Sequence, residues 1–246
     1  MPEAYHSHPD YGFPATSRGT ARGASPVPGP TMPRSRCPSS STMKRCVPVF
    51  TLGPPRHEHV ADLPVSQGGE RSVLAGDGVS ETNLRENPMG PAKFNERNYN
   101  VESEYEYGSR AGFWRLFRLF NSRKMKFTLY AVAQAVEEQP EVAARCVEEG
   151  HDVASHAYRW IDYHDVPVEK EKEYIRQCIT SLKSLTGYAP RGWYYGRNSP
   201  HSRTLVPQVY EEMGEDLVWA SDTYADDVPY WIDLPSSGRR RTPRGA

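Results

Sequence analysis

The sequence predicts an α/β fold in which short buried strands alternate with helices. Two observations support this prediction. Across residues 99–233, short runs rich in β-branched and aromatic residues alternate with longer segments whose apolar residues recur at helical spacing. Prolines and glycines stand where the helices are expected to begin and end. Strands separated by helices pair in parallel through right-handed crossovers, so we expect a parallel sheet or barrel.

The individual elements follow from local patterns. Strands are expected at residues 125–133, 152–155, 191–195 and 217–220. The first helix is expected at residues 109–123, capped by the Ser109 hydroxyl. A two-part helical stretch follows the first strand, with Pro140 near the start of its second part and Gly150 at its end. Further helices are expected at residues 167–187 and 203–213.

The first 60 residues differ in composition from the rest of the chain. Proline, serine, glycine and arginine crowd this region, and large apolar residues are scarce. Such a segment cannot offset the entropy lost on ordering. We therefore expect a disordered segment over residues 1–67, one folded domain over residues 68–235, and a solvated basic tail over residues 236–246.

Charge and cysteine content limit the partners and the compartment. The formal net charge is −1, which favours neither nucleic acid nor an anionic membrane. The four cysteines form no CxxC pair. Cys146 and Cys178 fall within expected helices, so we interpret them as small buried apolar residues of a reducing compartment. With no apolar run of membrane-spanning length, the default expectation is a soluble, cytoplasmic protein.

Polar residues follow three of the expected strands directly. They are His156 after DVAS, Gly196 and Arg197 after RGWYY, and Ser221 and Asp222 after LVWA. The carboxyl ends of parallel strands meet at one edge of a sheet, where α/β proteins place their chemistry. A histidine there can act as acid, base or metal ligand, or it can simply be hydrogen-bonded within its loop.

The run EGHDVASHAYRWIDYHDV resembles the second motif of NodB-homology polysaccharide deacetylases. In that motif a metal-binding histidine stands four residues after the first one, but here the position is Trp160. Tryptophan has no lone pair for a metal, so we expect no metal site and no cofactor. Tryptophan at this place resembles the allantoinase branch, as do residues 102–115, 192–199 and 221–231. The resemblance implies an incomplete, deformed (β/α) barrel of the NodB-homology type.

The resemblance also implies a hydrolase of non-peptide carbon–nitrogen bonds that opens a cyclic amide such as allantoin. The expected catalytic residues are His156, Arg197 and Asp222. The planar guanidinium fork of Arg197 suits a carbonyl or ureido edge. The expected substrate-binding residues are Trp160, Tyr195, Tyr224, Asp226, Asp227 and Glu104. For the aromatic residues, ordinary core packing is an equal alternative, and a solvated turn is the alternative for the two aspartates.

Two other functions remain open. One is deacetylation of chitin or another N-acetylated polysaccharide, which Trp160 opposes. The other is an inactive remnant that binds a partner. The expected partner is a small molecule rather than nucleic acid or membrane, and the sequence leaves a homo-oligomer open.

The family's first motif, a strand ending in Asn-Tyr-Glu-Glu-Gly-Gly-Glu, is not intact before Gly68. Residues 38–45 and 46–67 stand in its place, and neither resembles a strand. A one-nucleotide shift would let the codons of residues 38–45 encode the missing strand. We therefore hypothesise that residues 15–67 are a frame-shifted exon followed by an unspliced intron. Relatives also continue beyond residue 235, so we expect the chain as written to be poorly stable and inactive.

Overall fold

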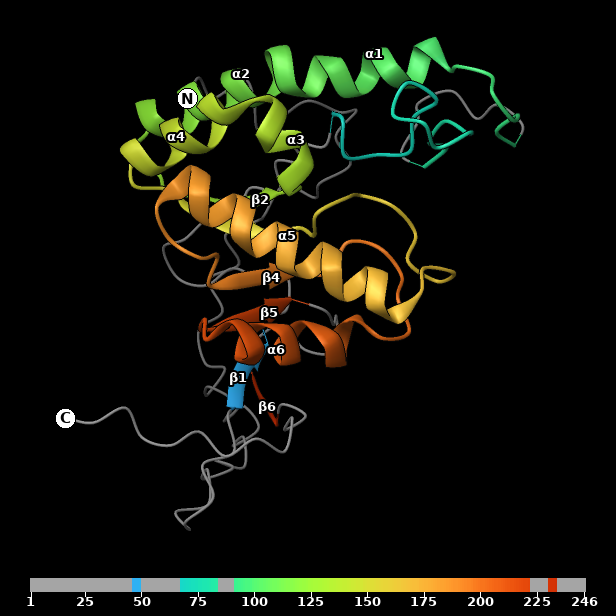
Figure 1. Ribbon diagram of the computed structural model, residues 1–246. Helices are drawn as coiled ribbons and strands as arrows, with labels where there is room; N and C mark the ends of the chain where they lie inside the picture. The colour runs from blue at the N-terminus through green and yellow to red at the C-terminus, as the bar shows by residue number, and fades with distance from the viewer. Residues whose placement is uncertain (1–45, 50–66, 84–90, 222–229, 234–246) are drawn as a thin grey trace, which may run out of the picture. The chain divides into compact units, whose positions relative to one another are not determined.

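Six strands form one sheet in the computed structural model, which describes residues 46–49, 67–83, 91–221 and 230–233 (Figure 1). The strands are β1 Cys46–Val49, β2 Thr128–Ala131, β3 Asp152–Ser155, β4 Gly192–Tyr194, β5 Trp219–Ser221 and β6 Tyr230–Asp233. Their order in the sheet is β2-β3-β4-β5-β1-β6. The strands from β2 to β1 pair in parallel, and β6 pairs antiparallel with β1. The predicted parallel α/β fold is confirmed.

Helices connect the strands and cover the sheet. They are α1 Tyr99–Tyr107, the π-helix η3 Gly108–Gly112, α2 Phe113–Ser122, α3 Ala133–Glu138, α4 Pro140–Glu148, α5 Val168–Thr186 and α6 Ser202–Met213. Helix α5 packs against α3, α4 and α6, as Figure 1 shows. It ends where predicted, because Gly187 adopts a φ of +86° that an L side chain would oppose.

One hydrophobic core lies between these helices and the sheet. The strands contribute buried residues such as Leu129, Val153 and Trp193, and α5 contributes Ile175 and Ile179 at helical spacing. Cys146 and Cys178 are also fully buried and are not in disulfides, which confirms their predicted burial. The core fixes the strand directions, and thereby the edge at which the strands end.

The first long helix begins ten residues earlier than predicted. Asn98 rather than Ser109 is the N-cap, and its side chain accepts a hydrogen bond from the Val101 amide. Ser109 lies within the helical stretch, buried and hydrogen-bonded to Gln67 and Glu106. The expected start was wrong because the glutamates in residues 102–106 leave α1 with few apolar residues, so its buried face gives only a weak periodic signal in the sequence.

The segment after Arg45 also differs from the prediction. Residues 46–67 were expected to hold no strand, yet Cys46–Val49 forms β1. Val49 pairs with Ala220 of β5, and Val47 pairs with Ile232 of β6. The β-branched valines suit extended backbone, and pairing to strands distant in sequence overrides the weak local signal.

The other boundaries follow the prediction within a few residues. Strand β2 is shorter than expected because Ala133 already begins α3. No helix in the described ranges is long and apolar enough to cross a membrane. The predicted basic tail at residues 236–246 and most of the predicted N-terminal segment lie outside the described residues.

Candidate functional site

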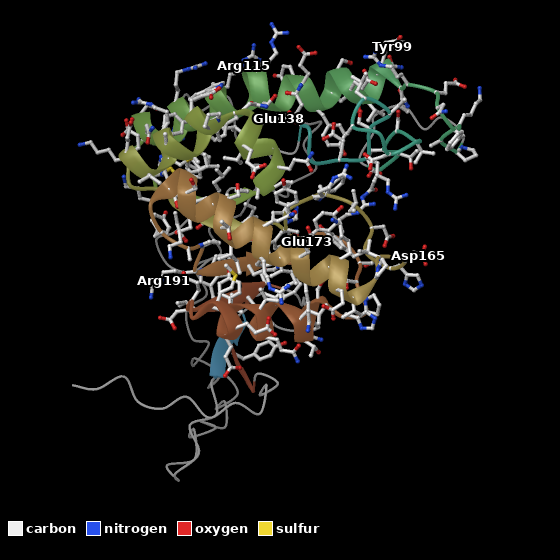
Figure 2. The ribbon with its side chains drawn as sticks, in the orientation of Figure 1. Tyr99, Arg115, Glu138, Asp165, Glu173 and Arg191 are labelled. Atoms are coloured by element: carbon white, nitrogen blue, oxygen red, sulfur yellow. The ribbon has the colours of Figure 1, made fainter. Side chains whose placement is uncertain are left out.

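A pocket opens at the carboxyl ends of β3 and β4. Arg191, before β4, and Asp165, in the loop after β3, mark the two opposite ends of these strands in Figure 2. The pocket lies at the carboxyl ends of the strands, on the same side as Asp165. Its empty volume is about 390 Å³, including space open to solvent. His156 and Arg197 both line it, so the structure brings together these two predicted residues.

His156 is a buried, neutral histidine. Its Nδ1 lies 3.2 Å from the Tyr194 carbonyl oxygen, which assigns the proton to Nδ1 and leaves Nε2 as an acceptor. Burial lowers its pKa to about 4, although the Tyr194 hydrogen bond opposes the shift; the positive charge of Arg197 lowers the pKa further. At neutral pH, Nε2 therefore offers a lone pair.

Gly196 allows this histidine ring its position. A Cβ built on Gly196 would lie 1.7 Å from His156 Cε1 and 2.5 Å from Nε2, far inside van der Waals contact. Glycine is the residue that permits such a close approach. The ring is also held against Tyr194, with 4.9 Å between ring centroids.

Arg197 stacks on Trp160 and leaves one donor unused. Its Cζ lies 4.5 Å from the Trp160 ring centroid, a cation–π contact. Its Nη2 is 3.7 Å from Oε2 of Glu81, and its Nη1 is buried without a hydrogen-bond partner among the described residues. Glu81 is itself held in place, because its Oε1 accepts from the Thr82 and Asn83 amides at 2.8 and 2.9 Å. Arg197 is thus a fixed cation whose Nη1 N–H has no partner among the described residues and lies beside the pocket.

The residues around His156 do not fit the zinc site implied by the deacetylase motif. Trp160 stands where the second histidine ligand would be, and its ring packs against Arg197 and Tyr105. Its backbone amide donates to the Gly69 carbonyl at 2.7 Å, which fixes the loop. Within the described ranges, no group of three His, Cys, Asp or Glu side chains is arranged to hold a metal ion.

Three buried carboxylates near this region were not among the predicted site residues. They are Glu70, Glu81 and Glu171. Burial raises the Glu70 pKa to about 7, against the opposing effect of its backbone hydrogen bonds. Glu70 directly follows Gly68 and Gly69, so its motif offered a signal. Glu171 was hidden in the charge run EKEKE, although it falls on the same helical face as Ile175.

Arg159 ties the segment that carries Glu70 to the loop after β3. Its Nη1 and Nη2 donate to the two Asp77 carboxylate oxygens at 2.7 Å each, and Nη2 also donates to the Glu70 carbonyl at 2.9 Å. Both side chains of the Arg159–Asp77 pair are largely buried. A two-pronged pair of this kind fixes orientation as well as distance.

Of the remaining predicted site residues, two lie in the described part of the chain and four do not. Tyr195 lines the pocket. Glu104 lies half-buried on α1, where its charge raises the pKa of the neighbouring Tyr105 as one of several causes after burial. The others, which lie outside the described residues, are Asp222, Tyr224, Asp226 and Asp227.

Comparison with known proteins identifies the family. Residues 97–217 match the polysaccharide deacetylase family model. A putative polysaccharide deacetylase of Schizosaccharomyces pombe is 43% identical over 176 residues, which is 70% of this chain and 55% of that protein. The chain belongs to the polysaccharide deacetylase family. It is therefore a member of a hydrolase family.

Two solved structures of similar sequence support the same fold. The crystal structure of Puue allantoinase matches with a TM-score of 0.64 and 42% identity, covering 71% of this chain and 56% of that one. A probable polysaccharide deacetylase from Pseudomonas aeruginosa PAO1 matches with a TM-score of 0.62 and 45% identity, covering 68% and 54%. This polysaccharide deacetylase family member spans about half the length of these relatives.

Proposed function

We propose that this site opens a small planar cyclic amide by hydrolysis, the reaction of an allantoinase. The observation that carries the proposal is Trp160 stacked beneath Arg197 at the position of the motif's second histidine. The tryptophan replaces a metal ligand by a buried apolar ring that supports Arg197 from outside the pocket lining, and the arginine adds a planar set of donors to that lining. A flat ligand with several carbonyl groups suits the Arg197 donors together with the aromatic lining residues Tyr194 and Tyr195.

Amide hydrolysis requires an oriented water, a donor for the oxyanion and a proton for the leaving nitrogen. The free Nη1 of Arg197 is the donor that we assign to the oxyanion. His156 presents an unprotonated Nε2 that can accept a hydrogen bond from the water. Because its pKa of about 4 makes it a weak base, we assign it orientation of the water rather than proton storage. We propose that the carboxylate of Asp222, two residues after Ala220 in the sequence, takes a proton from the attacking water and returns it to the leaving nitrogen as the ring C–N bond breaks.

The second candidate is deacetylation of an N-acetylated polysaccharide. Two of the similar proteins carry that name, the one from Schizosaccharomyces pombe and the one from Pseudomonas aeruginosa. The same free Arg197 donor would serve the oxyanion of an acetamide. Trp160 distinguishes the two reactions, because the zinc-dependent form needs a lone pair where the indole stands.

Binding and turnover by the purified 246-residue protein test the proposal. Hydantoin, allantoin and N,N′-diacetylchitobiose are titrated by calorimetry, with and without added zinc, and their hydrolysis products are followed in parallel. We expect the two cyclic amides to bind independently of zinc and the chitobiose not to bind. Arg197→Lys should weaken binding at least about tenfold, because lysine lacks the planar fork.

The matched control is Arg191→Lys, the same change at an exposed residue on the opposite end of β4. It should leave the affinity unchanged. Zinc-dependent release of acetate from the chitobiose would overturn the proposal in favour of deacetylation. Absence of any cyclic-amide binding would overturn it as well.

A further inference from the structure

Glu171 is a buried carboxylate that the proposed reaction does not use. It lies in the first turn of α5, is 1% exposed, and lines the same pocket as His156 and Arg197. The hydroxyls of Ser199 and Ser202 both donate to its Oε1, at 2.7 and 2.5 Å. Its Oε2 has no hydrogen-bond partner in the part of the chain that the structure describes.

Such an arrangement leaves one oxygen ready to accept. Two serine donors fix the carboxylate, since Ser199 Oγ in turn accepts from the His201 and Ser202 amides at 3.0 Å each. The first helical turn favours a negative charge. A buried acceptor without a partner costs free energy, which a ligand N–H can recover. The fixed geometry means that little ordering is needed when the ligand binds.

The pocket thus contains two complementary groups that have no partner within the described ranges, on the chain segments that follow two neighbouring strands. Arg197 offers a buried N–H donor, and Glu171 offers a buried acceptor. A ligand that satisfies both must carry a carbonyl at one end and an N–H donor at the other. A cyclic amide such as hydantoin has its N–H donors next to its carbonyl groups within one ring, whereas a ureido arm carries an NH₂ donor beyond the ring, at the end opposite a carbonyl bound to Arg197.

We propose that Glu171 Oε2 accepts a hydrogen bond from the NH₂ of a ureido arm on the substrate. Glu171 is thus a specificity-determining residue that selects a ureido-substituted cyclic amide over the bare ring. This inference rests on the proposed cyclic-amide hydrolysis. A purely structural role for Glu171, holding the start of α6, would predict no dependence on the substrate's arm.

The test compares two ligands that differ by the arm. Hydantoin has the ring alone, and allantoin has the ring with a ureido substituent. Dissociation constants of both are measured by calorimetry for the wild-type protein and for Glu171→Gln. We expect the wild type to bind allantoin at least about tenfold more tightly than hydantoin, as a charge-assisted hydrogen bond would give. Glu171→Gln should bind hydantoin as the wild type does and lose most of the preference for allantoin.

Glu173→Gln is the matched control. Glu173, labelled on α5 in Figure 2, carries the same charge two residues away, but its carboxylate bonds Lys170 and Gln177 at the exposed surface. This variant should keep the full preference. Ser202→Ala removes one of the donors that fix Glu171 while keeping Oε2, and should reduce the preference by a smaller factor.

The possible results distinguish failure of the role assigned to Glu171 from failure of the proposed function. If hydantoin binds but the wild type shows no preference for allantoin, the assignment of Glu171 is overturned, even if Glu171→Gln does not fold. A preference that persists in a folded Glu171→Gln protein overturns it equally. If neither ligand binds the wild type, the proposed function fails, and this inference fails with it.

Discussion

Gly196→Ala should disrupt the site more than any surface change of equal size. The new Cβ would lie 1.7 Å from His156 Cε1, 2.5 Å from Nε2 and 2.7 Å from Nδ1. Carbon atoms in proteins do not approach so closely, so the imidazole must move by more than 1 Å. That movement breaks the hydrogen bond from Nδ1 to the Tyr194 carbonyl.

The magnitude follows from two effects. Overpacking of a filled interior costs about 1–3 kcal/mol. A buried polar group that loses its partner costs a further ~1–3 kcal/mol. We therefore expect Gly196→Ala to lower the free energy of unfolding by about 2–6 kcal/mol. A displaced, better-hydrated ring should also show a higher pKa, shifted from about 4 toward the ordinary 6.5.

Urea denaturation and an NMR titration of the His156 ring measure these two quantities. Gly112→Ala is the control, because a Cβ there meets its nearest neighbour, Tyr107 Cε1, at an ordinary 3.5 Å. Within a helical stretch this change should stabilise the protein by ~0.5–1 kcal/mol. If Gly196→Ala unfolds at the wild-type urea concentration with an unchanged histidine pKa, the close packing of ring and glycine is refuted.

Three further predictions concern neighbouring residues. The pKa of His156 is about 4 in the folded protein and 6.5 ordinarily, so the unfolded chain binds a proton first as the pH falls. The free energy of unfolding should therefore decrease by about 3 kcal/mol between pH 6.5 and pH 4. In urea unfolding, His156→Gln should flatten this pH dependence. Arg159→Ala leaves the buried Asp77 carboxylate without its ion-pair partner, so the free energy of unfolding should fall by about 3 kcal/mol and amide exchange around Asp77 should become faster. Equal exchange rates in both proteins would contradict the pairing. Trp160→Phe keeps an aromatic ring against Arg197 but weakens the cation–π contact that positions it, so hydantoin affinity should fall a few-fold in calorimetry. An unchanged affinity would argue against this role of the stacking.

The helices and strand exits were predictable where local chemistry determines them. Pro167 and Gly187 bound α5 as expected, because one opens a helix and the other ends it in a left-handed conformation. His156 and Arg197 meet because parallel strands end at one edge of the sheet. Both predictions needed only the local sequence and the rule for parallel pairing.

Features that depend on distant partners were not predictable. Strand β1 exists through pairing with Ala220 and Ile232, far along the chain. Glu81 and Glu171 could not be distinguished from surface carboxylates, because their burial depends on packing against other elements. The position of Glu81 beside Arg197 is a tertiary contact between segments 116 residues apart.

The helical stretch from α1 through α2 shows how a four-residue repeat can be kept on one side of a helix. Val101, Tyr105, Ser109, Phe113 and Phe117 all face the protein interior, each four positions after the last. In a regular helix of 3.6 residues per turn, each such step advances about 40° too far, so four steps would rotate the last side chain about 160° from the first. The π turn in the middle holds one residue more than an α turn, which removes about 100° of this rotation. The continuous helical stretch can therefore direct Tyr105 toward Trp160 and Phe117 into the core. Removing a single residue from the π turn would rotate one of these two side chains away from its contact.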